Sequence, residues 1–336
     1  MRAVRLESIG SMAMHMVEKP SAGAGEIIVR VLAAGICGSD RHMYKGEYPT
    51  AIPVTLGHEF CGLVEEVGEG VSSFVGGELV TVDPNIACGT CPACRRGRPN
   101  LCANLKAIGV TRDGGFADYV AVPSGQAFLL PSDLDPVHGA FCEPLACCIH
   151  AIDKAKIRPG DSVAILGGGV IGLLMVQLAR LAGAGQVILI TRQLSRREAA
   201  LRLGATQALD PTATDAVTAV RDLTAGGADV VIECAGVPET LQTGVHMVRR
   251  GGALVLFGVT PAGLQVPLLP FDLLVNEVEI RPAYLNPFTH SRAAAMVAGG
   301  VLELDSLVTK TIGLEQVAGV VGSAPLAGEI KVIVRP

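Results

Sequence analysis

The chain has 336 residues and a formal net charge of −5, and 49% of its residues are hydrophobic. This length favours two domains, each with a core of its own. This slightly negative net charge gives no electrostatic reason to expect a nucleic acid or an anionic membrane as a partner. The 41 glycines follow no three-residue period, which excludes collagen and predicts many tight turns.

No run of about twenty apolar residues is present, so we expect no transmembrane helix. Residues 1–20 also lack the unbroken apolar core of a signal peptide. We therefore expect a cytoplasmic protein, in which thiols stay reduced. The ten cysteines then indicate metal binding or core filling rather than a disulfide framework.

The residue pattern of the segment 1–150 is typical of an irregular β domain. Short apolar stretches broken by glycine and proline are typical of strands and turns, and they occur at 26–35, 61–71, 77–82 and 116–123. No internal repeat or long linker interrupts them. We therefore expect a β-rich first domain.

Four cysteines lie close together in the polar stretch 88–102, with the spacing C-x2-C-x2-C-x7-C. Thiolates at this spacing can converge on one tetrahedral ion. Free cysteines usually lie in apolar surroundings, which this stretch lacks. The sequence therefore predicts a structural zinc site with a closed ligand set, made of Cys88, Cys91, Cys94 and Cys102.

Between about 151 and 285, continuous apolar strands alternate with helical stretches, as in a parallel sheet covered on both faces. After the first strand, Gly167, Gly169 and Gly172 stand in G-x-G-x-x-G register. Such glycines permit a tight turn, close approach of a pyrophosphate and close helix packing, and the helix beginning at Val170 and Ile171 offers free N–H groups. We therefore predict an α/β Rossmann fold, a doubly wound parallel sheet that binds a dinucleotide.

The end of the second strand of this sheet indicates which dinucleotide binds. An NAD site normally carries Asp or Glu at this point, whereas the chain has Thr191. Arg192 and Arg196 follow, and either could pair with a 2′-phosphate. The sequence therefore favours NADP(H) over NAD(H). The alternative is that both arginines lie on a solvated face of the next helix.

Three separated segments carry residue types that bind metals. They are "GICGSDRH" with Cys37, Ser39, Asp40 and His42, "LGHEFCG" with His58 and Glu59, and "FCEPLACCIH" with Glu143. Together with the four cysteines and the glycine turn, they resemble the zinc-dependent medium-chain dehydrogenase/reductase family over essentially the whole chain. The "EPLA" stretch at 143–146 resembles the sorbitol (polyol) and threonine dehydrogenase branch.

This resemblance implies a chaperonin-10-like β domain, residues 1–150 completed by 286–336, and a Rossmann domain at 151–285. It implies a catalytic zinc ion held by Cys37, His58 and Glu59, with Glu143 either a further ligand or the residue that holds a water. A mixed N/O/S ligand set with an open position suits catalytic zinc, which lowers the pKa of a bound hydroxyl. The resemblance further makes Asp40 the carboxylate that orients a liganding histidine, and Ser39 and His42 a proton relay to solvent.

The activity implied is hydride transfer between NADP(H), or NAD(H), and a secondary alcohol/ketone pair. Polyol dehydrogenases of the family carry an Arg-Tyr pair after the last Rossmann strand, but here Tyr284 has no arginine beside it. The small-molecule substrate is therefore either a polyol or a less polar alcohol, with Tyr44 and Phe288 as candidate pocket walls. The resemblance also implies two zinc ions per chain and a homodimer or homotetramer built through the edge of the Rossmann sheet.

Two alternatives remain at the level of the sequence. One is a zinc-free enoyl or quinone reductase of the same fold, which has no need of Cys37, His58 and Glu59 together. The other is a non-catalytic module that binds zinc and a nucleotide, which would hold one zinc ion and turn over no alcohol.

Overall fold

The computed structural model describes residues 1–336, and they divide into two units. The β unit comprises Met1–Ala146 together with Asn286–Pro336, and the Rossmann unit comprises Cys147–Leu285. The sequence predicts the boundary between the two domains at residue 150, whereas the structure divides between Ala146 and Cys147, inside helix α4 (Cys142–Ala155). No helix combines the length and the apolar character needed to cross a bilayer.

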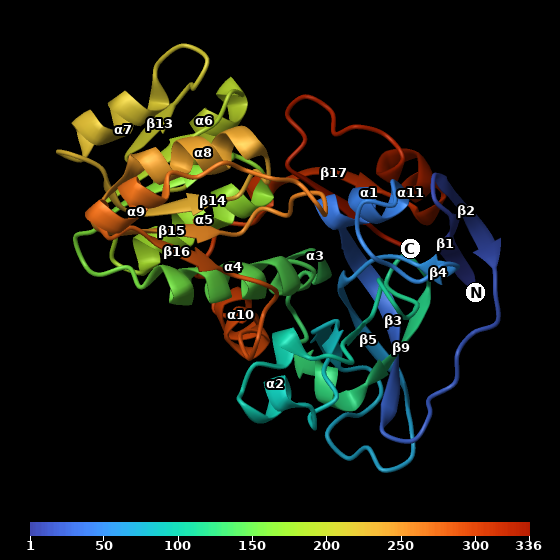
Figure 1. Ribbon diagram of the computed structural model, residues 1–336. Coiled ribbons are helices and arrows are strands. Elements are labelled where there is room, and N and C mark those ends of the chain that lie inside the picture. Colours follow the sequence, from blue (N-terminus) through green and yellow to red (C-terminus); the bar gives the residue numbers. More distant parts are fainter. The chain divides into compact units, whose positions relative to one another are not determined.

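The largest sheet of the β unit has the order β10-β6-β5-β3-β18-β17, with β9 also paired to β3. Figure 1 labels its strands β3, β5, β9 and β17. The long central strand β3 pairs antiparallel with β5, β9 and β18. Its inward residues, among them Ile27, Val29 and Val31, are buried in the main core of the unit. The strands of this sheet are β3 (Glu26–Ile36), β5 (Glu59–Val67), β6 (Leu79–Val82), β9 (Tyr119–Pro123), β10 (Ala127–Leu129), β17 (Val308–Ile312) and β18 (Lys331–Val334).

A second, three-stranded sheet and several short helices complete the β unit. The N-terminal hairpin of this sheet was not predicted, because its second strand is largely half-exposed and has no β-branched or aromatic residue. The sheet consists of β1 (Arg2–Ser8), β2 (Ser11–Met16) and β4 (Val54–Thr55). The helices are α1 (Gly38–Tyr44), α3 (Pro136–Gly139), α10 (His290–Ala298) and α11 (Leu314–Val321), with 3-10 turns η2 (Ser124–Gln126) and η3 (Asp305–Leu307).

The C-terminal segment is part of the β unit, because β18 lies between β3 and β17 in the large sheet. Two side chains near its start fix it further. Asn286 accepts a hydrogen bond from Asn85 (2.7 Å) and donates one to Asp83 (3.2 Å). The hydroxyl of Thr289 donates to the carbonyl of Ala146 at 2.7 Å.

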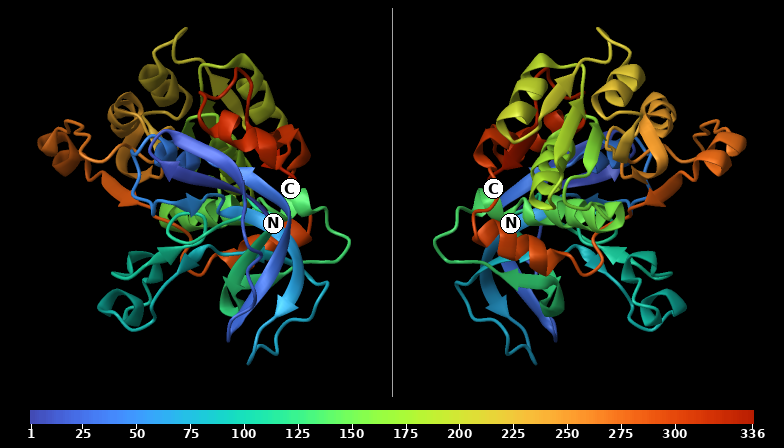
Figure 2. Two further views of the ribbon diagram at one scale, coloured as in Figure 1. Left: turned by 90° about the vertical axis from the view of Figure 1, so that its right-hand side faces the viewer. Right: turned by 90° about the vertical axis from the view of Figure 1, so that its left-hand side faces the viewer.

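The four clustered cysteines lie in a small lobe, residues 85–107, which we call the cysteine lobe. Figure 2 shows it, in teal, projecting from the rest of the β unit in both views. A two-stranded hairpin closes its base, and two short helical turns form its tip. The elements are β7 (Asn85–Ile86), α2 (Pro92–Arg95), η1 (Pro99–Leu101) and β8 (Lys106–Ala107).

The Rossmann unit contains one six-stranded sheet in the order β13-β12-β11-β14-β15-β16, and all its pairings are parallel. This order is that of a doubly wound dinucleotide-binding sheet, so the predicted fold class is confirmed. The strands are β11 (Ser162–Leu166), β12 (Gln186–Ile190), β13 (Gln207–Leu209), β14 (Ala228–Glu233), β15 (Val248–Leu256) and β16 (Glu279–Pro282). The helices are α5 (Val170–Leu181), α6 (Leu194–Arg202), α7 (Ala216–Leu223), α8 (Pro238–Met247) and α9 (Pro270–Asn276).

His290 is a titratable group inside the β unit. It is 1% exposed, lies against the ring of Phe128 with centroids 4.9 Å apart, and places Nε2 3.3 Å from the hydroxyl of Thr81. Burial lowers the pKa of His290 to about 3. The folded protein therefore keeps this imidazole neutral at pH values where an unfolded chain would protonate it.

We expect His290 to steepen the acid sensitivity of the fold. At pH values between the unfolded pKa, near 6.5, and the folded one, only the unfolded chain binds the proton. The free energy of unfolding therefore decreases by up to about 1.4 kcal/mol for each pH unit by which the pH is lowered. Urea-unfolding midpoints measured from pH 7 to pH 4.5 should fall less steeply in His290→Gln than in the wild type. The exposed His246→Gln serves as control and should keep the wild-type slope; equal slopes in all three proteins would contradict the prediction.

Candidate functional site

Cys37, His58 and Glu59 come together where two paired strands meet. Cys37 follows β3 and is the N-cap of α1, while His58 and Glu59 stand at the start of β5. The antiparallel register sets Gly35 opposite Glu59, which brings the end of one strand to the start of the other. The Cys37 thiol, a ring nitrogen of His58 and a carboxylate oxygen of Glu59 all lie within 4.8 Å of one another.

This donor set fits a zinc ion. Zinc–ligand bonds of about 2.0–2.3 Å in a tetrahedron place neighbouring ligand atoms roughly 3.3–3.8 Å apart, so small side-chain movements bring all three atoms to bonding distance. Sulfur, nitrogen and oxygen donors are all zinc ligands, and three protein ligands leave a fourth position open. The geometry therefore permits an open, catalytic type of site.

Asp40 and Ser39 flank His58 on its two ring nitrogens. Asp40 is fully buried, places Oδ1 3.4 Å from Nδ1 of His58 and accepts a 2.8 Å hydrogen bond from the backbone N–H of Cys37. The hydroxyl of Ser39 lies 3.2 Å from Nε2. Burial disfavours the imidazolium, but Asp40 and then Cys37 outweigh it and raise the pKa of His58 well above its usual value.

A buried lysine, which the sequence analysis did not identify, contacts the same cluster. The ammonium of Lys331 on β18 pairs with Oε2 of Glu59, and both side chains are almost completely buried. The two residues are 272 positions apart, so no local motif connects them. The only signal in the sequence is a lysine within an otherwise apolar terminal run, "IKVIV".

The other candidates of the β unit lie outside this cluster. Glu143 is buried in the first turn of α4 but is not among the ligand atoms that come together. His42 pairs with Glu47 at 2.7 Å near the surface. The hydroxyl of Tyr44 donates to the carbonyl of Gly10 at 2.6 Å, which holds its ring at the N-terminal hairpin. Phe288 is 73% exposed and adopts a positive φ of 60°.

The thiols of the cysteine lobe converge as their spacing predicts. All four sulfurs lie within 4.8 Å of one another, and those of Cys91 and Cys94 are 3.5 Å apart. Backbone N–H groups of Thr90 and Cys91 lower the pKa of Cys88 to about 5. Cys102 accepts N–H bonds at 3.3 Å from Cys88 and Asn104. Amides that donate to thiolates and four converging sulfurs fit a closed zinc site.

The glycine turn of the Rossmann unit joins β11 to α5. Gly167 adopts a φ of 107°, which favours glycine. A Cβ at Gly172 would overlap the carbonyl oxygen of Gly167, whereas a Cβ at Gly169, the N-cap of α5, would meet no atom within 4 Å. Gly167 is therefore required by its backbone conformation and Gly172 by packing, while open space remains at Gly169 for a close ligand. Val170 and Ile171 form the first turn of α5.

Thr191 directly follows β12 and lies beside this turn. A Cβ at Gly168 would lie 2.8 Å from Cγ2 and 2.9 Å from Oγ1 of Thr191, so the side chain of Thr191 packs directly against the backbone of the turn. Arg192 is exposed, and Arg196 is half-buried in α6. A third arginine, Arg197, is already used: it pairs with Asp210 at 2.8 Å and donates to the carbonyls of Thr191 and Arg192.

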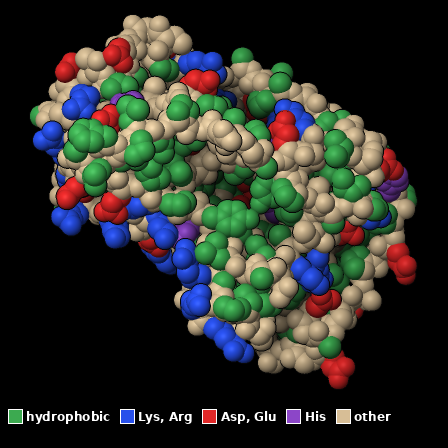
Figure 3. All heavy atoms as spheres, in the orientation of Figure 1, with side chains coloured by type: hydrophobic (Ala, Val, Ile, Leu, Met, Phe, Trp, Pro, Cys, Tyr) green, Lys and Arg blue, Asp and Glu red, His purple; other side chains and the backbone are tan.

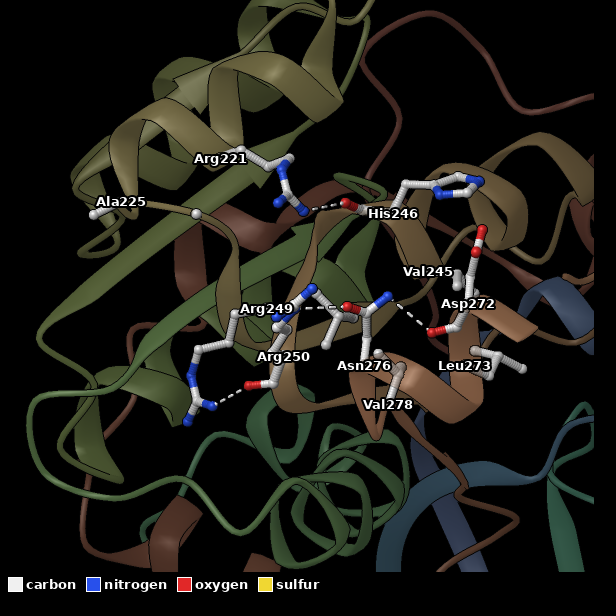
Figure 4. Close-up of a pocket in the computed structure, with 12 residues that line it drawn as sticks. Arg221, Ala225, Val245, His246, Arg249, Arg250, Asp272, Leu273, Asn276 and Val278 are labelled. Carbon is white, nitrogen blue, oxygen red and sulfur yellow. Dashed lines mark hydrogen bonds between the residues drawn. The ribbon is translucent and has the colours of Figure 1, made fainter. Parts of the chain in front are cut away.

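A hollow of about 520 Å³ lies elsewhere in the Rossmann unit, at the amino-terminal ends of β14 and β15 (Figure 4). Dinucleotides bind at the opposite, carboxyl edge of such a sheet. The arginines around the hollow bond to the protein itself. Figure 4 shows Arg221 bonded to the carbonyl of His246, Arg249 to the carbonyl of Arg250 and Arg250 to Asn276. Arg249 also pairs with Asp229. We therefore assign it no part in the candidate site.

Two family models match the chain. Residues 23–132 match the alcohol dehydrogenase GroES-like domain, and residues 170–298 match the zinc-binding dehydrogenase domain. The sorbitol dehydrogenase of Bacillus subtilis is 35% identical over 94% of this chain and 91% of its own length. The L-threonine 3-dehydrogenase of Pyrococcus abyssi is 36% identical over 87% of this chain and 86% of its own.

Among solved structures, a zinc-binding dehydrogenase of Sinorhizobium meliloti 1021, bound to NADP, is 53% identical with a TM-score of 0.98, covering 100% of this chain and 99% of that chain. The matches to both family models and to relatives over nearly the full length confirm the resemblance read from the sequence. The chain belongs to the family of zinc-dependent medium-chain dehydrogenases/reductases, in the branch of the sorbitol and threonine dehydrogenases.

Proposed function

We propose that this protein is a zinc-dependent oxidoreductase that transfers hydride between a nicotinamide dinucleotide and a secondary alcohol/ketone pair. The observation that carries the proposal is the convergence of Cys37, His58 and Glu59 within 4.8 Å, in a chain that also has the glycine turn. The relatives named for sorbitol and for C3 of L-threonine support a secondary carbinol as the reacting group.

In this proposal, each residue of the cluster has a part. Cys37, His58 and Glu59 hold the zinc ion, which when bound acts as a Lewis acid that makes a hydroxyl easier to deprotonate. Asp40 orients His58 through its contact with Nδ1. Ser39 accepts the substrate proton, and His42, paired with Glu47, passes it to solvent. We assign Glu143 to the same centre as a further ligand or as the residue that holds a water.

The substrate proposed is a secondary alcohol, either a polyol or a less polar alcohol. Arg281, the arginine nearest to Tyr284 in the sequence, bonds to Glu279 and to the carbonyls of Lys154 and Ala155. Its guanidinium is therefore committed to the fold and is not free to bind several substrate hydroxyls. Tyr44 and Phe288 remain the pocket walls that we propose.

Zinc analysis tests this function. We expect two zinc ions per chain in the wild type and one in each of Cys37→Ser and Cys91→Ser, as counted by mass spectrometry. Cys37→Ser should keep the fold but lose alcohol turnover by at least about 100-fold, because Lewis-acid stabilisation is worth several kcal/mol. Cys61→Ser, a change at a buried cysteine outside both clusters, controls for the substitution and should keep two zinc ions.

The alternatives give different results in the same experiment. A zinc-free enoyl or quinone reductase would keep its turnover in Cys37→Ser and in the presence of a chelator. A non-catalytic zinc and nucleotide-binding module would hold one zinc ion and turn over none of the alcohols tested. A panel of secondary alcohols, polyols and amino alcohols with both cofactors would then identify the substrate class.

We further propose that NADP(H) is preferred over NAD(H). The position directly after β12 carries Thr191 rather than a carboxylate, and the exposed Arg192 that follows can pair with a 2′-phosphate. Asp210, which follows β13, is neutralised by Arg197 and therefore does not repel the phosphate. The NADP bound by the Sinorhizobium relative supports the same preference.

A matched pair of arginine variants tests the cofactor preference. Arg192→Ala should lower kcat/KM for NADP by about 10- to 100-fold, since a charge-assisted bond to a phosphate is worth roughly 1.5–3 kcal/mol, and should leave that for NAD within about threefold. Arg202→Ala, at an exposed arginine that ends α6, should change neither value. A wild-type enzyme that prefers NAD would end the claim.

We also propose a cytoplasmic homo-oligomer, at least a dimer, because zinc thiolates need reduced thiols and because the Rossmann unit exposes apolar side chains near a sheet edge. Strand β16 ends the sheet, and the helix before it, α9, exposes 72% of Phe271 and 75% of Leu274. Figure 3 shows apolar side chains gathered on this part of the surface. Such a patch favours a second copy of the chain.

Light scattering after size exclusion tests the oligomer. Phe271→Asp/Leu274→Asp should shift the mass from the oligomer to the monomer, because two charges cannot be buried unpaired in an apolar contact. Leu201→Asp, at an exposed leucine on α6, should leave the mass unchanged. An unchanged mass in the double variant, or a monomeric wild type, would contradict this part of the proposal.

A further inference from the structure

Lys331 is a fully buried lysine beside the candidate zinc centre. Its ammonium contacts Oε2 of Glu59 and lies 3.3 Å from the carbonyl oxygen of Ile36. Taking an ammonium out of water costs several kcal/mol unless anionic groups compensate it. The burial of this lysine is therefore explained by the groups that it contacts. The main one is Glu59, which we place among the zinc ligands.

The register of three strands explains how the two side chains meet. Strand β3 lies between β5 and β18, and Gly35 on β3 pairs with Glu59 on one side and with Ile333 on the other. A Cβ at Gly35 would come within 2.6 Å of Cε and 2.8 Å of Nζ of Lys331. Because glycine leaves this space free, the ion pair crosses the central strand directly above its backbone.

With Cys37 as a thiolate and His58 neutral, as both would be as zinc ligands, the charges of this corner balance only when both the lysine and a divalent cation are counted. The Cys37 thiolate and the carboxylates of Glu59 and Asp40 carry a formal charge of −3, and Lys331 reduces it to −2. A zinc ion would bring the sum to zero.

We propose that Lys331 is a positioning residue that competes with the zinc ion for Glu59 and thereby weakens metal binding at this centre. Its ammonium holds Oε2, so Glu59 offers the metal only its other oxygen, and the positive charge of the ammonium opposes the cation. In the metal-free protein the same ammonium stabilises the buried carboxylate. The inference rests on the proposed function, because it takes Cys37, His58 and Glu59 as the ligands of a zinc ion.

Metal affinity, measured apart from turnover, tests this role. In Lys331→Met, the zinc dissociation constant of the centre should fall at least tenfold in competition with a chelator, while the zinc ion of the cysteine lobe serves as internal reference. The metal-free variant should also melt at a lower temperature than the metal-free wild type, whereas the zinc-loaded forms should differ less. Lys310→Met, at an exposed lysine of the neighbouring strand β17, should change neither quantity.

A second pair of variants covers the case in which Lys331→Met does not fold. Glu59→Gln leaves the ammonium facing the metal without its partner and should weaken zinc binding. Adding Lys331→Met to Glu59→Gln replaces the buried ion pair by neutral groups, which proteins tolerate well, and should restore affinity at least tenfold. Equal affinities in these two proteins would overturn the inference.

The possible failures can be told apart. A wild type with two zinc ions whose affinity is indifferent to Lys331 overturns the inference and leaves the proposed function standing. A wild type with a single zinc ion that survives Cys37→Ser overturns the proposed function, and the inference with it. A lower zinc affinity in Lys331→Met than in the wild type would also overturn the inference, because it would make the lysine a purely structural support of Glu59.

Discussion

The balance of charge in one buried corner of the β unit is the constraint on which the candidate site depends. Glu59 and Asp40 are both withdrawn from water, and an unpaired buried carboxylate costs several kcal/mol. The sheet meets this cost through topology, because the order β5-β3-β18 sets Lys331 across from Glu59. The C-terminal strand β18 is therefore an essential part of the site, because its Lys331 supplies the positive charge that allows the carboxylate of Glu59 to be buried.

Glycines, which have no side chain, shape both candidate sites in two different ways. At Gly35 and Gly172 the space is already filled by neighbours, so a Cβ would displace an ion pair in one case and a backbone carbonyl in the other. At Gly169 the space is open. The first kind of glycine allows elements to pack closely, and the second leaves room for a ligand. Only the second kind is direct evidence for binding, although both look alike in the sequence.

The sequence predicted those features whose determinants lie close together along the chain. The Rossmann strands, the glycine turn and the cysteine lobe each depend on residues within a few tens of positions, and the structure contains all of them. Cys37 and His58 were joined through a family resemblance rather than through spacing. Lys331 was not predicted, because its partner is 272 residues away and a single lysine forms no pattern. The first hairpin was missed because strand β2 has no β-branched or aromatic residue to distinguish it from a loop.

The cofactor end of the Rossmann unit illustrates why residue types alone do not fix a site. The sequence places three arginines within six positions of Thr191, which suggests a strongly positive pocket. Tertiary pairing removes one of them, since Arg197 is bound to Asp210 and to two backbone carbonyls. That pairing also removes the negative charge of Asp210, which accepts further hydrogen bonds from Thr212. The pairing of Arg197 with Asp210 therefore removes a repulsion of the 2′-phosphate but adds no attraction for it. The attraction has to come from an arginine that does not already bind another part of the protein.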